Sequence, residues 1–239
     1  MKAAELYEDI REYCKKHADK KYAKKHAKFF IEGYDAYGLS KDIFEDKVHS
    51  LINDENISMR LILSTSKLLI KSGKYEEAHY AIRLLHELSD QYDEKTFSHI
   101  EQWFKIGIIN WGHCDVLCVY QMTTLFEKKL ITLDNLSDWR NAENKYQRRA
   151  VPVAMLVLLK MRKNYKPLFK FIEPLMMDPE KKVQQGLGWF LREAWKIKPK
   201  ETEAFLLKWK NDAPRTIFQY ATEKMTAVEK KRFRKEKKL

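Results

Sequence analysis

The stretch from residue 179 to residue 197, PEKKVQQGLGWFLREAWKI, indicates the fold class more clearly than any other part of the chain. Its apolar residues recur in alternating steps of four and three: Val183, Leu187, Phe190, Ala194 and Ile197. This spacing predicts one long amphipathic helix that buries those five side chains. Gly186 and Gly188 each cost about 1 kcal/mol inside a helix relative to alanine, so they predict a close approach of a neighbouring element.

The same helical periodicity recurs along the rest of the chain, and no segment shows the alternation of a strand. Helices are predicted over residues 3–14, 15–30, 40–51, 58–72, 75–89, 94–109, 111–129, 145–161, 167–177 and 179–197, with a last pair between 201 and 229. Short connections and a weak period of about 35–40 residues are typical of stacked antiparallel helix pairs. We therefore predict an all-α, HEAT-like solenoid that forms a single domain over residues 1–239, with a concave basic face.

The net charge of +12 is concentrated in two places. Residues 15–28 hold seven lysines and one aspartate, and residues 229–239 hold seven lysines and arginines and two glutamates. Such clusters fit contact with nucleic acid phosphate, but they also fit a solvated helix face. With that alternative left open, a basic helical N-terminal segment, residues 1–38, is predicted to bind DNA through Lys21, Lys24, Lys25 and Lys28. The second cluster is predicted to be a frayed tail.

Several features that the sequence lacks restrict the possible functions. No apolar run approaches the roughly 20 residues that cross a bilayer, and the N-terminus is charged and unlike a secretory signal. Cys114 and Cys118 flank no further ligands at the spacing of a zinc site, so they are predicted to be core residues. We expect no metal and no cofactor, a reducing cytoplasmic compartment with association to the nucleoid on DNA, and a monomer, since no apolar stripe is left for a partner.

Trp189 lies off the apolar stripe of its helix. At about 100° per residue it falls on the opposite side, where its neighbours are Lys182, Gln185, Arg192 and Lys196. A tryptophan in that position either packs beneath another element or presents its ring to a ligand. Because a nucleic-acid groove combines cations for phosphate with rings for sugar or base, the three cations and Trp189 are predicted to face DNA.

A second tryptophan precedes a carboxylate by four residues in the stretch 110–115, NWGHCD. Trp111 and Asp115 would share one face of a helix, close to its N-terminus, where the helix dipole favours a negative charge. Three apolar residues follow Asp115 at helical spacing: Val119, Met122 and Phe126. Asp115 is therefore predicted to begin an otherwise apolar stripe. Taken alone, this pattern also describes a capping aspartate beside a core tryptophan.

Four motifs occur in a fixed order between about Ala23 and Ala213. They are an aromatic-rich turn at 28–38, Trp-x-x-x-Asp at 111–115, Gln-Arg-x-Ala at 147–150, and Gly-Trp-x-Leu-Arg-Glu at 188–193 followed by Lys198-Pro199. In this order they resemble the DNA alkylation repair glycosylases built from HEAT-like repeats, the AlkD type. The last motif is the most specific of the four.

The resemblance implies a function and its residues. Members of that family excise positively charged N-alkylated purines, such as 3-methyladenine and 7-methylguanine, from double-stranded DNA by cutting the N-glycosidic bond. Trp111, Asp115 and Trp189 match the residues that flank the deoxyribose of the lesion, and Arg148 matches a DNA-backbone contact. The best-understood members leave the lesion in the duplex, whereas most glycosylases flip the base.

The chemistry is reasonable without the resemblance. An alkylated purine already carries a positive charge, so it leaves without much help from a general acid. The oxocarbenium that develops on the sugar needs stabilisation, which a nearby carboxylate and electron-rich indole faces supply. Asp115, Trp111 and Trp189 would therefore suffice.

Pro152 departs from a simple helical pattern. Proline is tolerated in a first turn but kinks a helix interior. This predicts that Arg148 lies just before the helix, and that the adjacent Arg149 shares its role.

Two other functions fit part of the pattern. A HEAT-like module could bind damaged or branched DNA without cutting it, although such relatives tend to lack the tryptophan and aspartate positions that this chain retains. A protein-binding helical scaffold is the commonest use of solenoids, but it gives no reason for Trp189 on a basic face. DNA binding would weaken steeply with salt, and scaffold binding would not.

Overall fold

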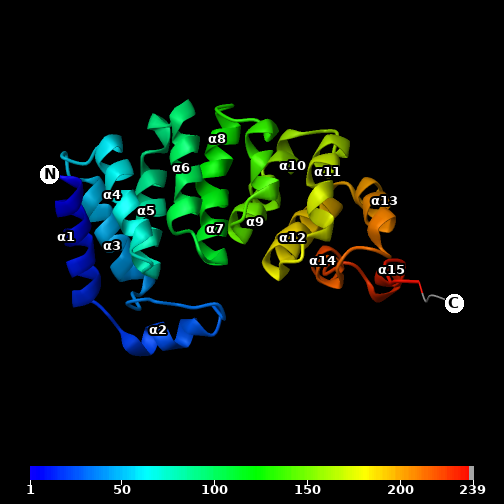
Figure 1. The fold of residues 1–239 in the computed structure, drawn as a ribbon, viewed down its shortest axis with the longest axis horizontal. Coiled ribbons are helices and arrows are strands. Elements are labelled where there is room, and N and C mark those ends of the chain that lie inside the picture. Colours follow the sequence, from blue (N-terminus) through cyan, green and yellow to red (C-terminus); the bar gives the residue numbers. More distant parts are fainter. Residues whose placement is uncertain (237–239) are drawn as a thin grey trace. The chain divides into compact units, whose positions relative to one another are not determined.

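The structure, a computed structural model, describes residues 1–236, and every regular element in that range is helical (Figure 1). The chain divides into two compact units, unit 1 (Met1–Leu125) and unit 2 (Phe126–Leu239), and the boundary falls inside α8 (Thr123–Glu127). Each unit is described by itself below. The all-α prediction is confirmed, whereas the single domain and the concave basic face remain predictions.

Unit 1 is built from two layers of helices. Its helices are α1 (Ala3–Lys16), α2 (Lys20–Ala27), α3 (Lys41–Ile52), α4 (Met59–Lys71), α5 (Tyr75–Glu87), α6 (Glu94–Ile106) and α7 (Trp111–Leu117), with a 3₁₀ turn at Ser89–Gln91. Helices α1, α4 and α6 pack on one another in one layer, and α3, α5 and α7 do so in the other. Helix α4 packs on α5 across the layers, as expected of a repeated helix pair.

The predicted helix boundaries in unit 1 follow from local chemistry. The side chains of Ser40 and Ser58 accept backbone N–H bonds at the starts of α3 and α4, which is the bond an N-cap supplies. Gly73, with φ of 76°, lets the chain reverse between α4 and α5. The predicted helix over 15–30 is wrong in one respect, because Asp19 ends the run by capping a separate helix, α2.

The segment between α2 and α3 is held by one buried carboxylate. Glu76, in the first turn of α5, accepts backbone N–H bonds from Tyr37, Gly38 and Leu39 at 2.9, 2.7 and 3.2 Å. Gly38 has φ of 89°, and a Cβ there would lie 2.1 Å from the carbonyl oxygen of Asp19. Only glycine fits this position. The turn that it permits directs backbone N–H groups at the buried carboxylate, and these bonds satisfy it.

Unit 2 is organised around α12 (Lys181–Ile197), which packs against α9, α13 and α14. The other helices are α9 (Lys145–Ala154), α10 (Leu158–Met161), α11 (Lys166–Ile172), α13 (Pro199–Trp209), α14 (Arg215–Ala221) and α15 (Ala227–Lys231), with 3₁₀ segments at Leu133–Leu136, Asp138–Asn141 and Glu173–Met177. The predicted stripe of α12 is buried except at Ile197, which is half exposed because it is the last helical residue.

The two glycines of α12 accommodate different neighbours. A Cβ on Gly188 would lie 2.4 Å from the Cβ of Tyr220 and 2.8 Å from the carbonyl oxygen of Ile217, both on α14. A Cβ on Gly186 would lie 3.2 Å from the Arg149 side chain on α9. The predicted close approach is therefore confirmed, and it is tightest at Gly188.

The predicted frayed tail is wrong for the residues that the structure describes. Phe233 is buried, and its carbonyl oxygen accepts a bond from the Arg215 guanidinium at 2.8 Å. Arg232 pairs with Glu203 at 2.6 Å, and Glu236 pairs with Lys210 at 2.6 Å. One apolar anchor and two ion pairs fix this segment, while residues 237–239 lie outside the described part of the chain.

Residues 1–236 contain neither a membrane-spanning helix nor a cluster of side chains able to hold a metal ion. No helix in this range is long and apolar enough to cross a membrane. Within the same range, no three histidine, cysteine, aspartate or glutamate side chains are placed to hold a metal ion. Cys14, Cys114 and Cys118 are fully buried, which confirms the predicted place of Cys114 and Cys118 in the core.

We predict that Gly188→Ala destabilises the protein by about 2 kcal/mol, because backbone atoms of α14 would have to move to admit the new methyl group. Gly186→Ala meets the stem of an arginine side chain, which can shift, so its cost is expected to be under about 1 kcal/mol. Urea unfolding of both variants measures the difference, and equal costs would contradict this account of the packing.

Candidate functional site

Helix α7 presents one edge to solvent. Asn110 caps it by accepting the N–H of His113 at 2.9 Å, so Trp111 is its first helical residue. Gly112, His113 and Cys114 are buried, whereas Trp111 and Asp115 are partly exposed. The predicted shared face is present. Asp115 lies in the second turn, however, where the helix dipole contributes less than at the N-terminus.

The predicted apolar stripe after Asp115 is buried at Met122 and Phe126 but wrong at Val119, because the helix changes its winding there. Residues 118–122 form a π-helical segment in which the N–H of Thr123 bonds back to the carbonyl of Cys118. The wider turn shifts the register, so Val119 is 46% exposed while Met122 is fully buried. Trp111, Asp115 and Val119 therefore form one accessible edge, which the sequence alone assigned partly to the core.

Trp111 is held in a fixed orientation by the segment between α2 and α3. Its indole N–H donates to the carbonyl oxygen of Phe29 at 3.1 Å. Its ring stacks on that of Phe30, with centroids 5.3 Å apart and planes 14° from parallel. A tryptophan fixed at both its polar atom and its face is pre-organised for contact with a ligand.

The stack continues inward from Phe30. Its ring is nearly parallel to Tyr34, at 4.7 Å, and meets Tyr75 edge-on at 5.1 Å. Tyr75 in turn stacks on His113 at 4.5 Å. Four aromatic rings thus connect the exposed face of Trp111 to the buried face of α7, and the aromatic-rich turn at 28–38 supplies two of them.

His113 is a neutral histidine with a defined tautomer. Its Nε2 lies 2.9 Å from the carbonyl oxygen of Tyr75, so Nε2 carries the proton and donates it. Nδ1 then accepts from the side-chain amide of Asn110 at 2.8 Å. Burial lowers the pKa of His113 to about 3, which keeps the ring uncharged. Asn110 thereby ties the start of α7 to the aromatic column.

Helix α2 supplies an exposed basic surface in the same unit. Lys21, Lys24, Lys25 and Lys28 are all exposed, and none of the four forms an ion pair within residues 1–236. The helix leads directly into Phe29, whose carbonyl holds Trp111. Phe29 and Phe30, which follow α2, therefore connect the lysines predicted to contact DNA with Trp111.

Arg148 lies inside α9, which contradicts its predicted position before the helix. Its N–H bonds to the carbonyl of Asn144, the residue that caps α9. Pro152 falls near the end of α9, where its missing N–H and its clash with the Arg148 carbonyl shorten the helix rather than delay its start.

The guanidinium of Arg148 already makes several hydrogen bonds within the protein. It pairs with Asp178 at 2.6 and 3.4 Å and donates to the carbonyls of Ala142 and Glu143 at 2.6 and 3.1 Å. These bonds within residues 1–236 use four of its five N–H groups. Arg149 is buried and donates to the carbonyl of Lys182 at 2.6 Å, so it joins α9 to α12 and is poorly placed to share the predicted DNA contact.

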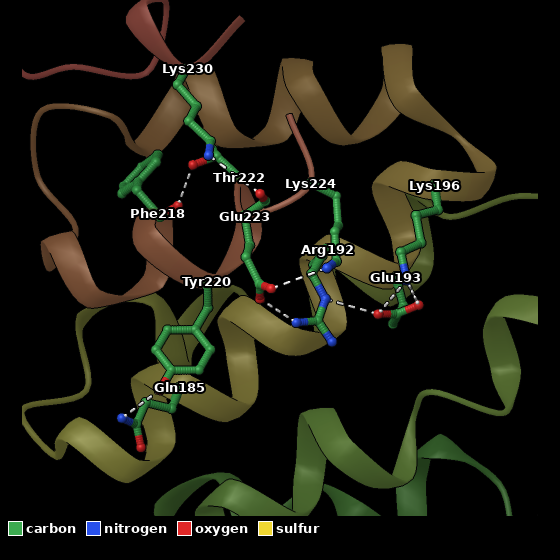
Figure 2. A network of polar contacts seen from close by, with 10 residues as sticks. All are labelled: Gln185, Arg192, Glu193, Lys196, Phe218, Tyr220, Thr222, Glu223, Lys224 and Lys230. Atoms are coloured by element: carbon green, nitrogen blue, oxygen red, sulfur yellow. Dashed lines mark hydrogen bonds and ion pairs between the residues drawn. The ribbon is translucent and has the colours of Figure 1, made fainter. Parts of the chain in front are cut away.

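Two of the three cations predicted to surround Trp189, Arg192 and Lys196, are paired with carboxylates (Figure 2). Arg192 bonds Glu193 on its own helix at 2.9 Å and Glu223, just after α14, at 2.5 Å. Lys196 pairs with Glu193 at 2.7 Å. The predicted basic surroundings of Trp189 are therefore largely neutralised, and Arg192 serves to fasten α14 to α12. Trp189 itself is partly exposed, in agreement with its place off the buried stripe.

The predicted site residues thus fall into two groups. Trp111, Asp115 and the four lysines belong to unit 1, and Trp189 with the remaining cations belongs to unit 2. The sequence did not predict the roles of Tyr75 and Asn110, which orient α7, or of Asp178, which forms an ion pair with Arg148. An asparagine before a helix is a recognisable cap signal, but nothing in the sequence marks the partners of Tyr75 or Arg148.

The fold and these features define a helical-repeat protein with a fixed tryptophan, an adjacent carboxylate and a basic helix. The sequence matches the DNA alkylation repair enzyme family over residues 10–225. The chain therefore belongs to that family. No curated protein matches the sequence significantly.

Solved structures with the same fold include two relatives. One is described as a predicted DNA alkylation repair enzyme from Enterococcus faecalis, with 14% identity, a TM-score of 0.71, and coverage of 88% of this chain and 98% of that one. The other is AlkD2 from Streptococcus mutans, with 19% identity, a TM-score of 0.57, and coverage of 87% and 99%. At these identities the likeness establishes the helical-repeat fold alone.

We predict that His113 makes unit 1 sensitive to acid. Between its ordinary pKa of 6.5 and its lowered value of about 3, the unfolded chain binds a proton at His113 that the folded chain does not. Stability should therefore fall as the pH is lowered through this window, by up to about 1.4 kcal/mol per pH unit from this one group.

His113→Gln removes that group while keeping an amide donor for Tyr75. Urea unfolding of wild type and His113→Gln at about pH 7 and about pH 5 should show a shallower pH dependence for the variant. Parallel curves would contradict the assignment of a buried neutral histidine.

Proposed function

We propose that this protein is a DNA glycosylase that hydrolyses the N-glycosidic bond of positively charged N-alkylated purines, including 3-methyladenine and 7-methylguanine, in double-stranded DNA. The observation that carries the proposal is in unit 1. Trp111 and Asp115 project from one accessible edge of α7, and the indole is fixed by the Phe30 stack and the Phe29 carbonyl. Family membership supplies the substrate class of alkylated DNA.

The proposed chemistry assigns Asp115 an electrostatic role. A purine alkylated on a ring nitrogen leaves as a neutral base when the bond to C1′ breaks, so no general acid is required. The sugar becomes an oxocarbenium ion, which the Asp115 carboxylate stabilises while it positions the attacking water. The face of the Trp111 indole attracts the same positive charge. A proton from that water is released to solvent or to Asp115 as the hydroxyl adds to C1′.

In this proposal Trp189 also contacts the deoxyribose of the lesion, and the base stays in the duplex. The sequence motif around Trp189 and its partial exposure support that role. The protein would act as a monomer in the cytoplasm without a metal or cofactor.

The DNA backbone would be bound chiefly through α2. Lys21, Lys24, Lys25 and Lys28 are exposed, and no ion pair competes for them within residues 1–236, so they can meet phosphate without losing another bond. Arg148 retains one N–H for a phosphate alongside its pair with Asp178. Arg192 and Lys196 would have to exchange carboxylates for phosphate, and Arg149 is left out because it is buried.

Asp115→Asn is expected to lower base release by at least about 100-fold, because the amide cannot stabilise the sugar cation. The assay measures free 7-methylguanine released from a duplex that carries a single lesion. DNA affinity should change little. Asp46→Asn removes an exposed carboxylate from α3 and serves as the control, with release expected at the wild-type rate.

Near wild-type release by Asp115→Asn would contradict the assignment of the catalytic residue. Absence of release by the wild type, with salt-sensitive DNA binding intact, would instead indicate a non-catalytic module that binds damaged or branched DNA. Partner binding that ignores salt would favour a protein scaffold.

The α2 surface predicts a specific salt dependence. Replacing Lys21, Lys24, Lys25 and Lys28 with alanine should reduce the slope of log affinity for duplex DNA against log salt by about 3 to 4, since each phosphate contact contributes about 0.9. A matched variant with alanine at exposed Lys67, Lys71, Lys95 and Lys105 loses the same charge elsewhere in unit 1. Equal slopes for the two variants would exclude α2 as the DNA-binding element.

A further inference from the structure

Unit 1 contains a cavity that the proposed glycosylase chemistry does not use. It has a volume of about 330 Å³ and lies between α2, α3, α5 and the segment that precedes α3. Aromatic rings, two glutamates, two histidines and a lysine contribute to its lining. Within the described chain, neither Trp111 nor Asp115 contributes to this lining. The volume is in the range of sites that hold a small organic ligand.

Aromatic rings dominate the walls of this cavity. Five of the lining residues are phenylalanine or tyrosine: Tyr22, Phe30, Tyr34, Phe44 and Tyr75. Several are immobilised by their neighbours, since Tyr34 packs on Tyr75 at 4.9 Å and Phe44 stacks on the buried Tyr80 at 4.1 Å. Fixed rings offer flat faces to a planar ligand, and their electron-rich faces favour one that is positively charged.

Carboxylates outnumber ammonium groups in the lining. Glu45 and Glu76 are acidic, and Lys41 is the lysine among the lining residues. The Glu76 carboxylate is bound by three backbone N–H groups. Glu45 has a partly exposed side chain, which forms an ion pair with Arg83 at 3.3 Å. Glu45 is therefore the carboxylate best placed to meet a ligand cation.

His79 supplies an unused hydrogen-bonding atom. Its ring stacks on Tyr75 and meets Phe44 edge-on, and its Nδ1 is buried without a hydrogen-bond partner among residues 1–236. Burial lowers the pKa of His79 to about 4, so the ring is neutral and can donate or accept one bond. A buried ring nitrogen without a partner is costly unless a ligand or water satisfies it.

We propose that this cavity binds a planar, positively charged nitrogen heterocycle, for which an N-alkylated purine nucleoside is a suitable ligand, at a site separate from Asp115. The rings stack on the heterocycle, Glu45 complements its charge, and the His79 ring turns to bond a polar edge atom of the ligand through Nδ1, which is buried in the structure. The proposal goes beyond DNA cleavage, because it concerns free ligand and requires no catalysis.

Isothermal titration calorimetry of the full chain tests the proposal with two isomeric probes. 1-Methyladenosine carries a positive charge at neutral pH, and N6-methyladenosine does not. The cation is expected to bind with a dissociation constant below about 1 mM, and about tenfold more tightly than its neutral isomer. Absence of binding near 1 mM, or equal affinity for both probes, would overturn the proposal.

Paired substitutions locate the binding site. Glu45 and Glu87 both pair with Arg83, but only Glu45 lines the cavity. Glu45→Gln should weaken 1-methyladenosine binding by about tenfold, and Glu87→Gln should leave it unchanged. Equal effects of the two substitutions would overturn the assigned site.

His79 and His86 offer a second matched pair on α5. Each stacks on a tyrosine and has a buried Nδ1 without a partner in the described chain, but only His79 lines the cavity. His79→Phe should lower the affinity by at least about fivefold, whereas His86→Phe should not. Thermal unfolding of all variants checks that the fold is retained.

Asp115→Asn separates this proposal from the proposed function. The variant should bind 1-methyladenosine as the wild type does, even where base release from DNA is lost. Loss of nucleoside binding in Asp115→Asn would place the ligand at α7 and overturn a separate site. Nucleoside binding that depends on Glu45 in a protein without glycosylase activity would refute the proposed function alone.

Discussion

The exposed edge of α7 that carries Trp111 depends on one constraint, the packing of the Phe30 ring. One face of this ring supports Trp111, and the ring also contacts Tyr34 and Tyr75. Phe30 belongs to a segment without regular structure, which bonds to α5 through the Asp35 carbonyl and through the backbone N–H groups of residues 37–39 that Glu76 accepts. The start of α5 thus helps to hold the segment on which the indole of Trp111 rests.

The same ring links the two proposed sites of unit 1. Phe30 stacks on Trp111 and lines the aromatic cavity, and Tyr75 lies between that cavity and His113. A ligand in the cavity would therefore touch rings that orient α7. Because Phe30 stacks directly on Trp111, a displacement of Phe30 would alter the support of the indole. This shared wall gives a physical route by which a free heterocycle could affect events at Asp115.

Cations serve different purposes in different parts of the chain. In unit 2, Arg148 and Arg192 are paired with Asp178 and Glu223, and these pairs join segments that are distant in sequence. The Arg148–Asp178 pair is largely buried, so removing one partner would leave an unpaired charge at a cost of several kcal/mol. In α2 the exposed lysines hold no such role, which leaves them available for a polyanion.

The sequence by itself determined the helical class, most helix boundaries, the close approach at Gly188 and the shared face of Trp111 and Asp115. Local spacing and capping decide these features, because they depend on residues near one another in the chain. Only the tertiary structure decided that Val119 is exposed, that Arg149 is buried, that Arg192 is paired and that Phe233 anchors the tail. Each of these depends on a π-turn or on a partner distant in sequence, and periodicity contains no information about either.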